Sequence, residues 1–552
     1  MPSYQQTCRA PLVDPVYVAL PDGAVHLEGS LRSLADRVLA LTNPDTVPPL
    51  DAVLASKLGE YTDLPPCPAI GSFAAALPDR LTEFACALQA AVLTAAAQKD
   101  KDAVLSCLQA VKVLDGKLPQ ITEYALLPAA ADLMRSVQEL YRRTGQAFLL
   151  TVMERIRSQV PDVSGLFHSF PFLKAFVPET VPDGAVDDAS KYFRRMKLLG
   201  TGSVMADALA LTAQFALFSG SARDAGASAV GLTALERFHG HPLGAFTADP
   251  YLAGREPWAA ADLRSLCAFL EALHDLLTAG GDLAVAERME RVTDNALAAA
   301  FAKGGVYPRQ SMNREFNDPA CEAAPPSRAD VSALLRAVTA VRRSVWMVKG
   351  EAELALLLPY DSVCLTRMNG VPVRVALKVN AEGNLRLNVE TKQPVQFTLS
   401  IRVPGYADSA RIAVGGEKPR TADSGALYTL RRVFQTGDQI ALDLTCKPVL
   451  KPGHRGSVSV FYRSLLMALP LPEADAAWQY ALDERAKPEV FFADGRPRVR
   501  VDACHAPGWT VKDGRIPSPP QGLRMGAPYE LTLLPYPETV GRVAVFPQAT
   551  HG

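Results

Sequence analysis

The sequence predicts a helical domain followed by a β-rich domain, in the form of an α/α toroid and an antiparallel β-sandwich. Apolar residues recur at helical spacing through the first two thirds of the chain, and after Lys349 they alternate with polar residues. The length of 552 residues also exceeds what one hydrophobic core normally serves. Two or three domains are therefore expected.

The helical part consists of predicted hairpins. Leu133, Val137 and Leu140 fall on one helix face, and a second helix begins near Phe148 after the Thr144-Gly145 break. Similar segments, separated by Gly, Pro or Asp, lie near residues 31–41, 81–98, 101–114, 188–219, 222–238, 259–279, 283–302 and 329–347. Paired helices in this number favour a toroid, although a bundle or a solenoid would show the same periodicity.

The β part shows the two-residue period of half-buried strands. Residues 395–403 alternate strictly, and 412–414 and 440–444 repeat the pattern between turn signals. Short strands at this spacing predict a β-sandwich. The predicted boundaries are a helical domain over 1–348, a sandwich over 349–470, and a C-terminal β segment over 471–552 that completes the sandwich or packs on it.

Composition narrows the range of partners. The chain has 57 Lys+Arg against 58 Asp+Glu, a net charge of -1, so no global field attracts nucleic acid or an anionic membrane. We expect neither partner, and a neutral carbohydrate fits. Nine scattered cysteines without a CxxC pair indicate a reducing compartment. With no signal-like N-terminus, a cytoplasmic protein is expected.

Several short motifs occur in a characteristic order. They are FHGHPLGAF at 238–246, GD at 281–282 with ER at 290–291 and Asn295, NGVPV at 369–373, FTLSIRVPGYA at 397–407, RRVFQTGD at 431–438, WQYAL at 478–482 and LTLLPY at 531–536. Together they resemble the β-L-arabinofuranosidase family, glycoside hydrolase family 127. The resemblance implies an (α/α)6 barrel followed by β-sandwich domains.

The resemblance also implies a particular chemistry. In that family a cysteine thiolate attacks the anomeric carbon, zinc held by three cysteines and a glutamate lowers the pKa of that thiol, and another glutamate is the acid/base. A metal suits this role because the thiolate is the reactive form of cysteine. A retaining mechanism places nucleophile and acid/base about 5 Å apart.

The chain departs from the zinc motif on one helix. Asp262 stands where the family has a glutamate, and Arg264 stands where it has a cysteine ligand. Arginine binds no zinc and brings a permanent positive charge. Cys267, one turn further on, reaches the same place only if the helix register shifts.

The second departure is the segment ACEAAPP at 320–326, where the family has two adjacent cysteines. In one alignment Cys321 remains as a candidate nucleophile beside Glu322. In the other, both cysteines have become Ala323 and Ala324. A third departure puts Pro250 in place of the acid/base glutamate and leaves Asp249 before it.

Too few ligands remain for the family's metal. One carboxylate and at most one thiolate do not hold a structural zinc, so no metal ligand and no cofactor are predicted. Without a metal the thiol of Cys321 keeps a pKa near ~8.5, which leaves little thiolate at neutral pH. Zinc-thiolate catalysis is therefore not expected.

The candidate site residues fall into two groups. The catalytic candidates are Cys321, Asp262, Asp249 and Glu322, with Glu315 as a further carboxylate; the substrate-binding candidates are His239, His241, Tyr251, Trp258 and Arg264. Each has a plainer interpretation: the histidines as loop residues, the aromatic residues as core, and Asp262 as an acid in the first turn of a helix.

Three functions follow from these patterns. The first is a hydrolase-like protein that acts on a neutral glycan or small glycoside through a rearranged carboxylate pair. The alternative is an inactive carbohydrate-binding pseudoenzyme or scaffold, and non-hydrolytic chemistry on another metabolite is the third. A homodimer is one expected assembly.

Overall fold

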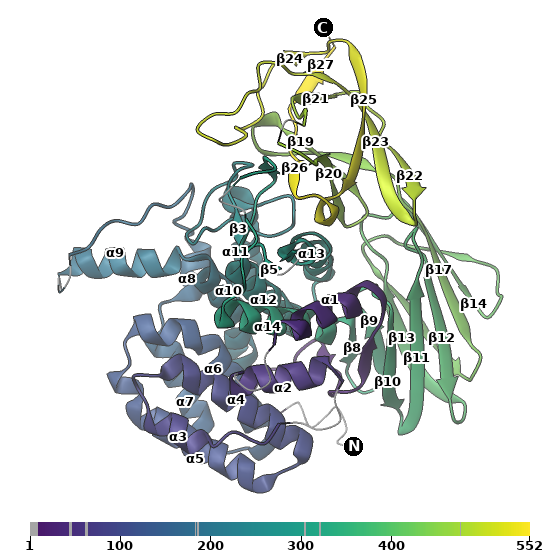
Figure 1. Ribbon diagram of the computed structural model, residues 1–552. Helices are drawn as coiled ribbons and strands as arrows, with labels where there is room; N and C mark the ends of the chain where they lie inside the picture. Colours follow the sequence, from purple (N-terminus) through teal and green to yellow (C-terminus); the bar gives the residue numbers. More distant parts are fainter. Residues whose placement is uncertain are drawn as a thin grey trace.

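The computed structural model describes residues 9–42, 47–60, 65–182, 184, 187–302, 305–318, 322–474 and 476–551. A helical half packs beside two β units, one of which bears the C-terminus (Figure 1). The predicted order of a helical domain followed by antiparallel β structure is confirmed.

Six helices form a closed inner ring. Each packs on the next in the order α2, α4, α6, α10, α12 and α14, and α14 packs back on α2. Their bounds are α2 Pro49–Leu58, α4 Leu81–Gln98, α6 Glu123–Thr144, α10 Gly202–Ser219, α12 Leu263–Gly280 and α14 Arg328–Val345. A ring that closes on itself is the arrangement of a toroid and excludes an open solenoid.

Other helices surround this ring. They are α1 Gly29–Ala40, α3 Ile70–Ala75, α5 Lys101–Lys117, α7 Phe148–Gln159, α8 Val163–His168, α9 Asp188–Leu199, α11 Ala222–His239 and α13 Leu283–Val292. Helices α5, α7, α11 and α13 pack on the inner helix that precedes or follows them. Helix α9 extends away from the ring (Figure 1).

Position in the ring explains the composition of two helices. By length and apolar character alone, α4 and α10 would be able to cross a membrane. However, 56% and 72% of these stretches are buried inside the fold. A helix enclosed by other helices is apolar on most of its faces, so the inner ring accounts for both segments.

The sandwich contains two sheets among the described residues. One has the strand order β1 Val18–Ala19, β8 Trp346–Lys349, β9 Glu353–Leu356, β13 Val395–Arg402 and β16 Leu427–Phe434. The other has the order β15 Arg420–Ala422, β14 Ser409–Val414, β17 Gln439–Thr445, β12 Leu385–Thr391, β11 Val371–Val379, β10 Ser362–Met368 and β2 Val25–Leu27. The predicted strands at 395–403, 412–414 and 440–444 are confirmed as β13, β14 and β17.

The N-terminal segment contributes to both sheets. β1 pairs with β8, and β2 pairs with β10. These residues lie within the range predicted for the helical domain, where no alternating pattern marks them. Two or three residues are too few for periodicity to show, so only the pairing partner defines such strands.

The C-terminal unit has a third sheet with its own core. Its path runs β18 Val449–Pro452, β19 Val458–Tyr462, β20 Leu465–Leu471, β25 Pro528–Pro535, β23 Arg496–His505, β21 Tyr480–Asp483, β27 Gln548–Thr550 and β24 Leu523–Arg524. β22 Glu489–Ala493 and β26 Gly541–Val543 pair at its sides, and β26 also pairs β7 Asn313–Arg314 of the helical half. The sheet begins before the predicted boundary at 471, and it packs around separate buried residues such as Trp478 and Trp509.

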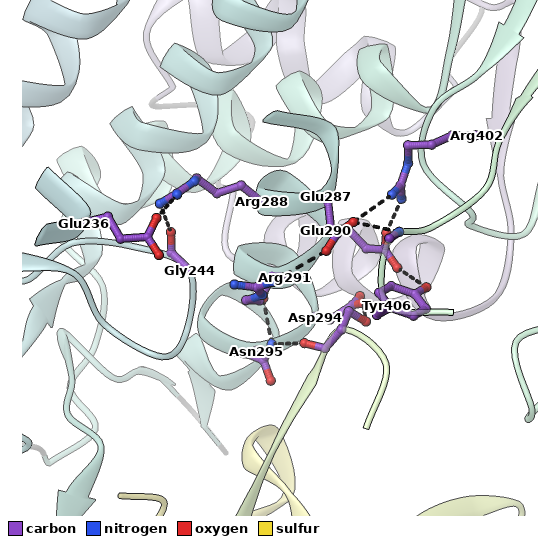
Figure 2. A network of polar contacts seen from close by, with 12 residues as sticks. Glu236, Gly244, Glu287, Arg288, Glu290, Arg291, Asp294, Asn295, Arg402 and Tyr406 are labelled. Atoms are coloured by element: carbon purple, nitrogen blue, oxygen red, sulfur yellow. Dashed lines mark hydrogen bonds and ion pairs between the residues drawn. The ribbon is translucent and has the colours of Figure 1, made fainter. Parts of the chain in front are cut away.

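A buried polar network joins the helical half to the sandwich (Figure 2). Glu290 of α13 forms an ion pair with Arg402 of β13, and both side chains are 2% exposed. The hydroxyl of Tyr406 donates to the other oxygen of Glu290 at 2.7 Å. The ER motif and the RVPGY motif therefore meet across the domain interface.

The helical turn that follows α13 connects the third sheet to this network. Here the chain forms a short π-helix, Thr293–Leu297. Asn295 donates to the carbonyl of Ser464 and accepts from the backbone of Leu466, both at 2.8 Å. Asp294 accepts from Tyr360 at 2.8 Å and from Ser464 at 2.5 Å, and burial followed by the charge of Glu290 raises its pKa to about 6.

Candidate active site

A small cavity lies at the N-terminal ends of α10 and α12. Its volume is about 190 Å³, and it is lined by Asp249, Ala253, Trp258, Ala259, Ala260, Arg309, Asn313, Asp318, Arg515 and Ile516. We call it the mouth cavity. Pockets for drug-sized ligands span about 300–1,000 Å³, so this one suits a single small unit such as one sugar ring.

Short ladders bring its residues together. Ala248 and Asp262 exchange backbone hydrogen bonds with neighbouring loop residues: Ala248 N–H donates to Ala260 at 2.9 Å, and Asp262 N–H donates to Ala248 at 2.8 Å. β3 Ala261–Asp262 pairs with β6 Arg309–Gln310 in a register that sets Asp262 against Arg309. Asp249, Asp262 and Arg309 thus share one end of the ring.

Asp249 forms an ion pair with an arginine on the wall of the mouth cavity. Its carboxylate lies 2.9 Å from Nε of Arg309 and is 29% exposed. Burial raises its pKa, and the charges of Arg309 and Arg515 partly oppose that rise. Asp249, predicted as a catalytic residue, thus lines the mouth cavity, and its catalytic role stays a prediction.

Asp262 has a structural role as well as a place beside Asp249. Its Oδ1 accepts the backbone N–H groups of Arg264 at 3.1 Å and Ser265 at 3.0 Å, and its Oδ2 accepts the hydroxyl of Ser265. It is therefore the N-cap of α12. Burial raises its pKa, the nearby charge of Asp249 adds to the rise, and the cap hydrogen bonds oppose it.

The C-terminal unit supplies one wall of the mouth cavity. The guanidinium of Arg515 lies 5.2 Å from the centre of the Trp258 ring, and the Trp258 residue is 38% exposed. Arginine over an indole face is a favourable cation–π arrangement. Sequence analysis missed Arg309 and Arg515, since no motif links either residue to the loop at 248–262.

The two histidines lie inside the fold, not on the cavity wall. His239 is fully buried; its Nε2 bonds the carbonyl of Phe172 at 2.7 Å, and its Nδ1 accepts the backbone N–H of Gly254 at 3.0 Å. Burial lowers its pKa to about 4. Both ring nitrogens are occupied, so the expectation of a sugar contact is corrected: His239 ties two loops together.

His241 and Tyr251 also lie away from the mouth cavity. The ring of His241 is buried, and burial followed by the charge of Arg542 lowers its pKa to about 3. Tyr251 packs edge-on against Phe176 at 6.1 Å. Neither lines the mouth cavity. Tyr251 pairs through its backbone with Thr201.

Arg264 is exposed to solvent at the start of the inner helix α12. Its side chain is 53% exposed and forms an ion pair with Asp330 at 2.9 Å. It also donates to Ser327 at 3.1 Å. These residues form the capping box of α14, so Arg264 connects the starts of two inner helices and does not contact the mouth cavity.

The described residues of the cysteine segment, 322–326, do not line the mouth cavity. Cys321 lies outside the described residues. Glu322 is exposed, and Ala324 exchanges two backbone hydrogen bonds with Val306, at 2.9 and 2.8 Å. Glu322 does not line the mouth cavity.

The donor set does not fit the family's zinc. Across the residues that the structure describes, no group of three or more His, Cys, Asp or Glu side chains is placed to bind a metal ion. The oxygens of Asp262 are engaged in the helix cap, and Cys267 is fully buried, which raises its thiol pKa well above the usual value.

Replacing Arg309 by methionine tests the electrostatics of this site. Removing the cation is expected to raise the pKa of Asp249 further, because Arg309 opposes the effect of burial. The acidic limb of the pH–activity profile should then move to higher pH. Arg264→Met, which removes an exposed arginine outside the mouth cavity, should leave the profile in place. A pH–activity profile that is unchanged in both variants would contradict the placement of Asp249, under the influence of Arg309, as the group whose ionisation sets the acidic limb.

Comparison with known proteins supports the fold. Residues 355–446 match the model of "Beta-L-arabinofuranosidase, GH127 middle domain". No curated protein matches. A solved structure titled "Glycoside hydrolase" superposes on this chain with a TM-score of 0.71 at 13% identity. The superposition covers 98% of this chain and 99% of the chain of that structure.

Two further structures are similar over nearly the whole length. A GH127 β-L-arabinofuranosidase from Geobacillus stearothermophilus T6 has a TM-score of 0.56 at 15% identity and covers 95% of this chain and 100% of its own. A structure titled GH127 β-arabinofuranosidase has a TM-score of 0.57 at 12% identity. The superposition covers 98% of this chain and 99% of the chain of that structure. At these identities the likeness establishes the fold, including the predicted toroid followed by β domains.

Proposed function

We propose that this protein is a glycoside hydrolase that acts on a neutral glycan or small glycoside through Asp249 and Asp262. The observation that carries the proposal is a cavity sized for one sugar unit, lined by Asp249, Arg309 and Arg515. Asp262 lies beside Asp249 just outside this lining, and burial raises the pKa of both carboxyl groups. Acid–base catalysis requires such a pair, since one group must hold a proton while the other is ionised.

The chemistry follows from mutual repulsion of the two carboxylates. When one is ionised, its charge favours the protonated form of the other. The protonated group donates to the glycosidic oxygen as the bond to the anomeric carbon breaks. The ionised group takes a proton from the attacking water, whose oxygen bonds to that carbon. Alternatively it attacks the carbon itself, and water then hydrolyses the glycosyl ester and frees the carboxylate, while the first group takes the proton of that water. Arg309 limits the rise in the pKa of Asp249.

An inactive carbohydrate-binding protein is the second candidate. The observation that favours it is the engagement of both Asp262 oxygens by the start of α12, which competes with a catalytic role. In that case Trp258 and Arg515 would hold a sugar that is never cleaved. Binding of a glycoside without product formation would distinguish this function from hydrolysis.

Turnover of a panel of aryl glycosides, with zinc content measured on the same sample, tests the proposal. We expect hydrolysis of at least one glycoside, substoichiometric zinc, and little change in Cys321→Ala, since the proposed site uses carboxylates. Activity abolished by Cys321→Ala together with stoichiometric zinc would contradict it. No turnover of any member of the panel would favour the binding protein.

Localisation and assembly remain proposals. The seven cysteines in the described part of the chain are all free thiols, which supports a reducing compartment such as the cytoplasm. A homodimer stays a prediction, and light scattering after size-exclusion chromatography would test it.

A further inference from the structure

A second polar cluster lies inside the ring of helices, apart from the mouth cavity. It comprises Asp132 and Arg135 of α6, Asp207 of α10, Glu271 of α12 and Arg336 of α14, and we call it the axial cluster. Glu271 follows Asp262 by nine positions on α12, which places it about 13 Å deeper along the helix. Interiors rarely contain so many charges unless these are paired.

Most of these charges are paired with one another. Arg336 binds both oxygens of Asp132, at 2.6 and 2.8 Å, and its Nε lies 2.9 Å from Glu271. Arg135 lies 2.5 Å from Asp132 and 2.6 Å from Asp275. The side chains of Asp132, Arg135, Arg336 and Glu271 are still 10–18% exposed. The packing therefore does not seal them completely.

Asp207 is the exception in the axial cluster. Among the described residues it has no hydrogen-bond or ion-pair partner, although Asp132 and Glu271 are close enough to affect its charge. Burial, followed by those two negative charges, raises its pKa to about 8. At neutral pH Asp207 is therefore mainly protonated and offers an O–H donor.

Two buried hydroxyls next to the cluster also lack partners among the described residues. They belong to Ser136, which is 2% exposed, and Thr339, which is 6% exposed. Ser136 follows Asp132 by four positions and Thr339 follows Arg336 by three, so each shares a helix face with a member of the cluster. A buried polar atom without a hydrogen bond costs about 1–3 kcal/mol, so a ligand that satisfies these atoms is favoured.

We propose that the axial cluster is a second binding site, separate from the mouth cavity, for one small neutral polyol. Each hydroxyl of a polyol both donates and accepts, which suits a mixture of carboxylates, guanidinium groups and hydroxyls. A divalent cation would be repelled by Arg135 and Arg336. An anion would be repelled by Asp132 and Glu271. The site does not depend on catalysis at the mouth cavity.

Calorimetric titration with L-arabinose, D-xylose and D-galactose tests this site in the full chain. We expect at least one sugar to bind the wild type. Asp207→Leu should weaken sugar binding at least about tenfold, which is the effect of one lost hydrogen bond to a charged or strongly polar group. Thr339→Val and Ser136→Ala should also weaken sugar binding. Asp207→Asn should retain affinity, because an amide replaces the protonated carboxyl. Asp249→Asn should leave affinity at this site unchanged.

The outcomes that overturn the proposal are distinct from failure of hydrolysis. Absence of binding by all three sugars would show an ordered water cluster only. Binding lost in Asp249→Asn and unaffected by Asp207→Leu would place the sugar in the mouth cavity. As a folding control, Asp207→Asn should be at least as stable as the wild type near pH 8. The pKa of Asp207 is higher in the folded state than in the unfolded state, so the wild type loses stability as the pH rises above the pKa of the unfolded state.

Discussion

Glu290→Gln is expected to lower the free energy of unfolding by about 3–5 kcal/mol, because it leaves the buried Arg402 cation without its partner. Arg402 is 2% exposed, so water cannot replace the lost carboxylate. The next carboxylate, Glu287, lies 4.0 Å away and compensates only in part. Urea denaturation followed by circular dichroism and by tryptophan fluorescence would measure the effect.

The neighbouring helix position provides a matched control. Arg288 pairs with Glu236, whose side chain is 57% exposed, so Arg288→Ala should cost no more than about 1 kcal/mol. Equal losses in Glu290→Gln and Arg288→Ala would show that the interface pair contributes no more than a surface pair. A double variant, Glu290→Met with Arg402→Met, should recover much of the loss, since no unpaired charge remains.

Asp249→Asn is expected to reduce kcat/KM by a factor of about 10² to 10⁴, the range for loss of a general acid or base. The asparagine preserves the size of the side chain but neither donates nor accepts a proton at neutral pH. Stability should change little, because the carboxylate is 29% exposed and its partner Arg309 remains 43% exposed to water. The measurement is steady-state kinetics on the glycoside found in the panel.

Glu322→Gln is the control for this prediction. Glu322 is an acidic candidate from the same motif comparison, yet the structure places it in an exposed position outside the mouth cavity. Its replacement should leave kcat/KM within about twofold. Activity lost in Glu322→Gln and retained in Asp249→Asn would move the acid/base role to the segment that contains Cys321.

The network in Figure 2 gives the recognised motifs a structural meaning. Glu290, Asn295 and Arg402 belong to the motifs that carry the resemblance, and all three lie at the interface of the helical and β units. They hold the scaffold, and none lines the mouth cavity. A chain can therefore retain these motifs whatever residues line the mouth cavity.

Much of the fold was predictable from local pattern. The spacing of Leu133, Val137 and Leu140 and the alternation over 395–403 each depend on one element meeting one core, which is a property of neighbouring residues. The sequence predicts a helix that starts near residue 259, whereas α12 begins at Leu263 because Asp262 is its N-cap. Closure of the ring and the pairing of β1 and β2 depend on distant partners, which no local pattern records.

By itself the sequence determined the order of domains and predicted that Arg264 stands where the family that it resembles has a cysteine ligand, because both depend on residue identity and local spacing. Only the tertiary structure decided which side chains meet. It brought Arg309 and Arg515 to Asp249, turned His239 inward onto two loops, and placed Asp207 near Asp132 and Glu271 within the ring. The physical reason is that burial and electrostatic environment arise from segments far apart in the chain, and these set both the pKa values and the hydrogen bonds that remain available.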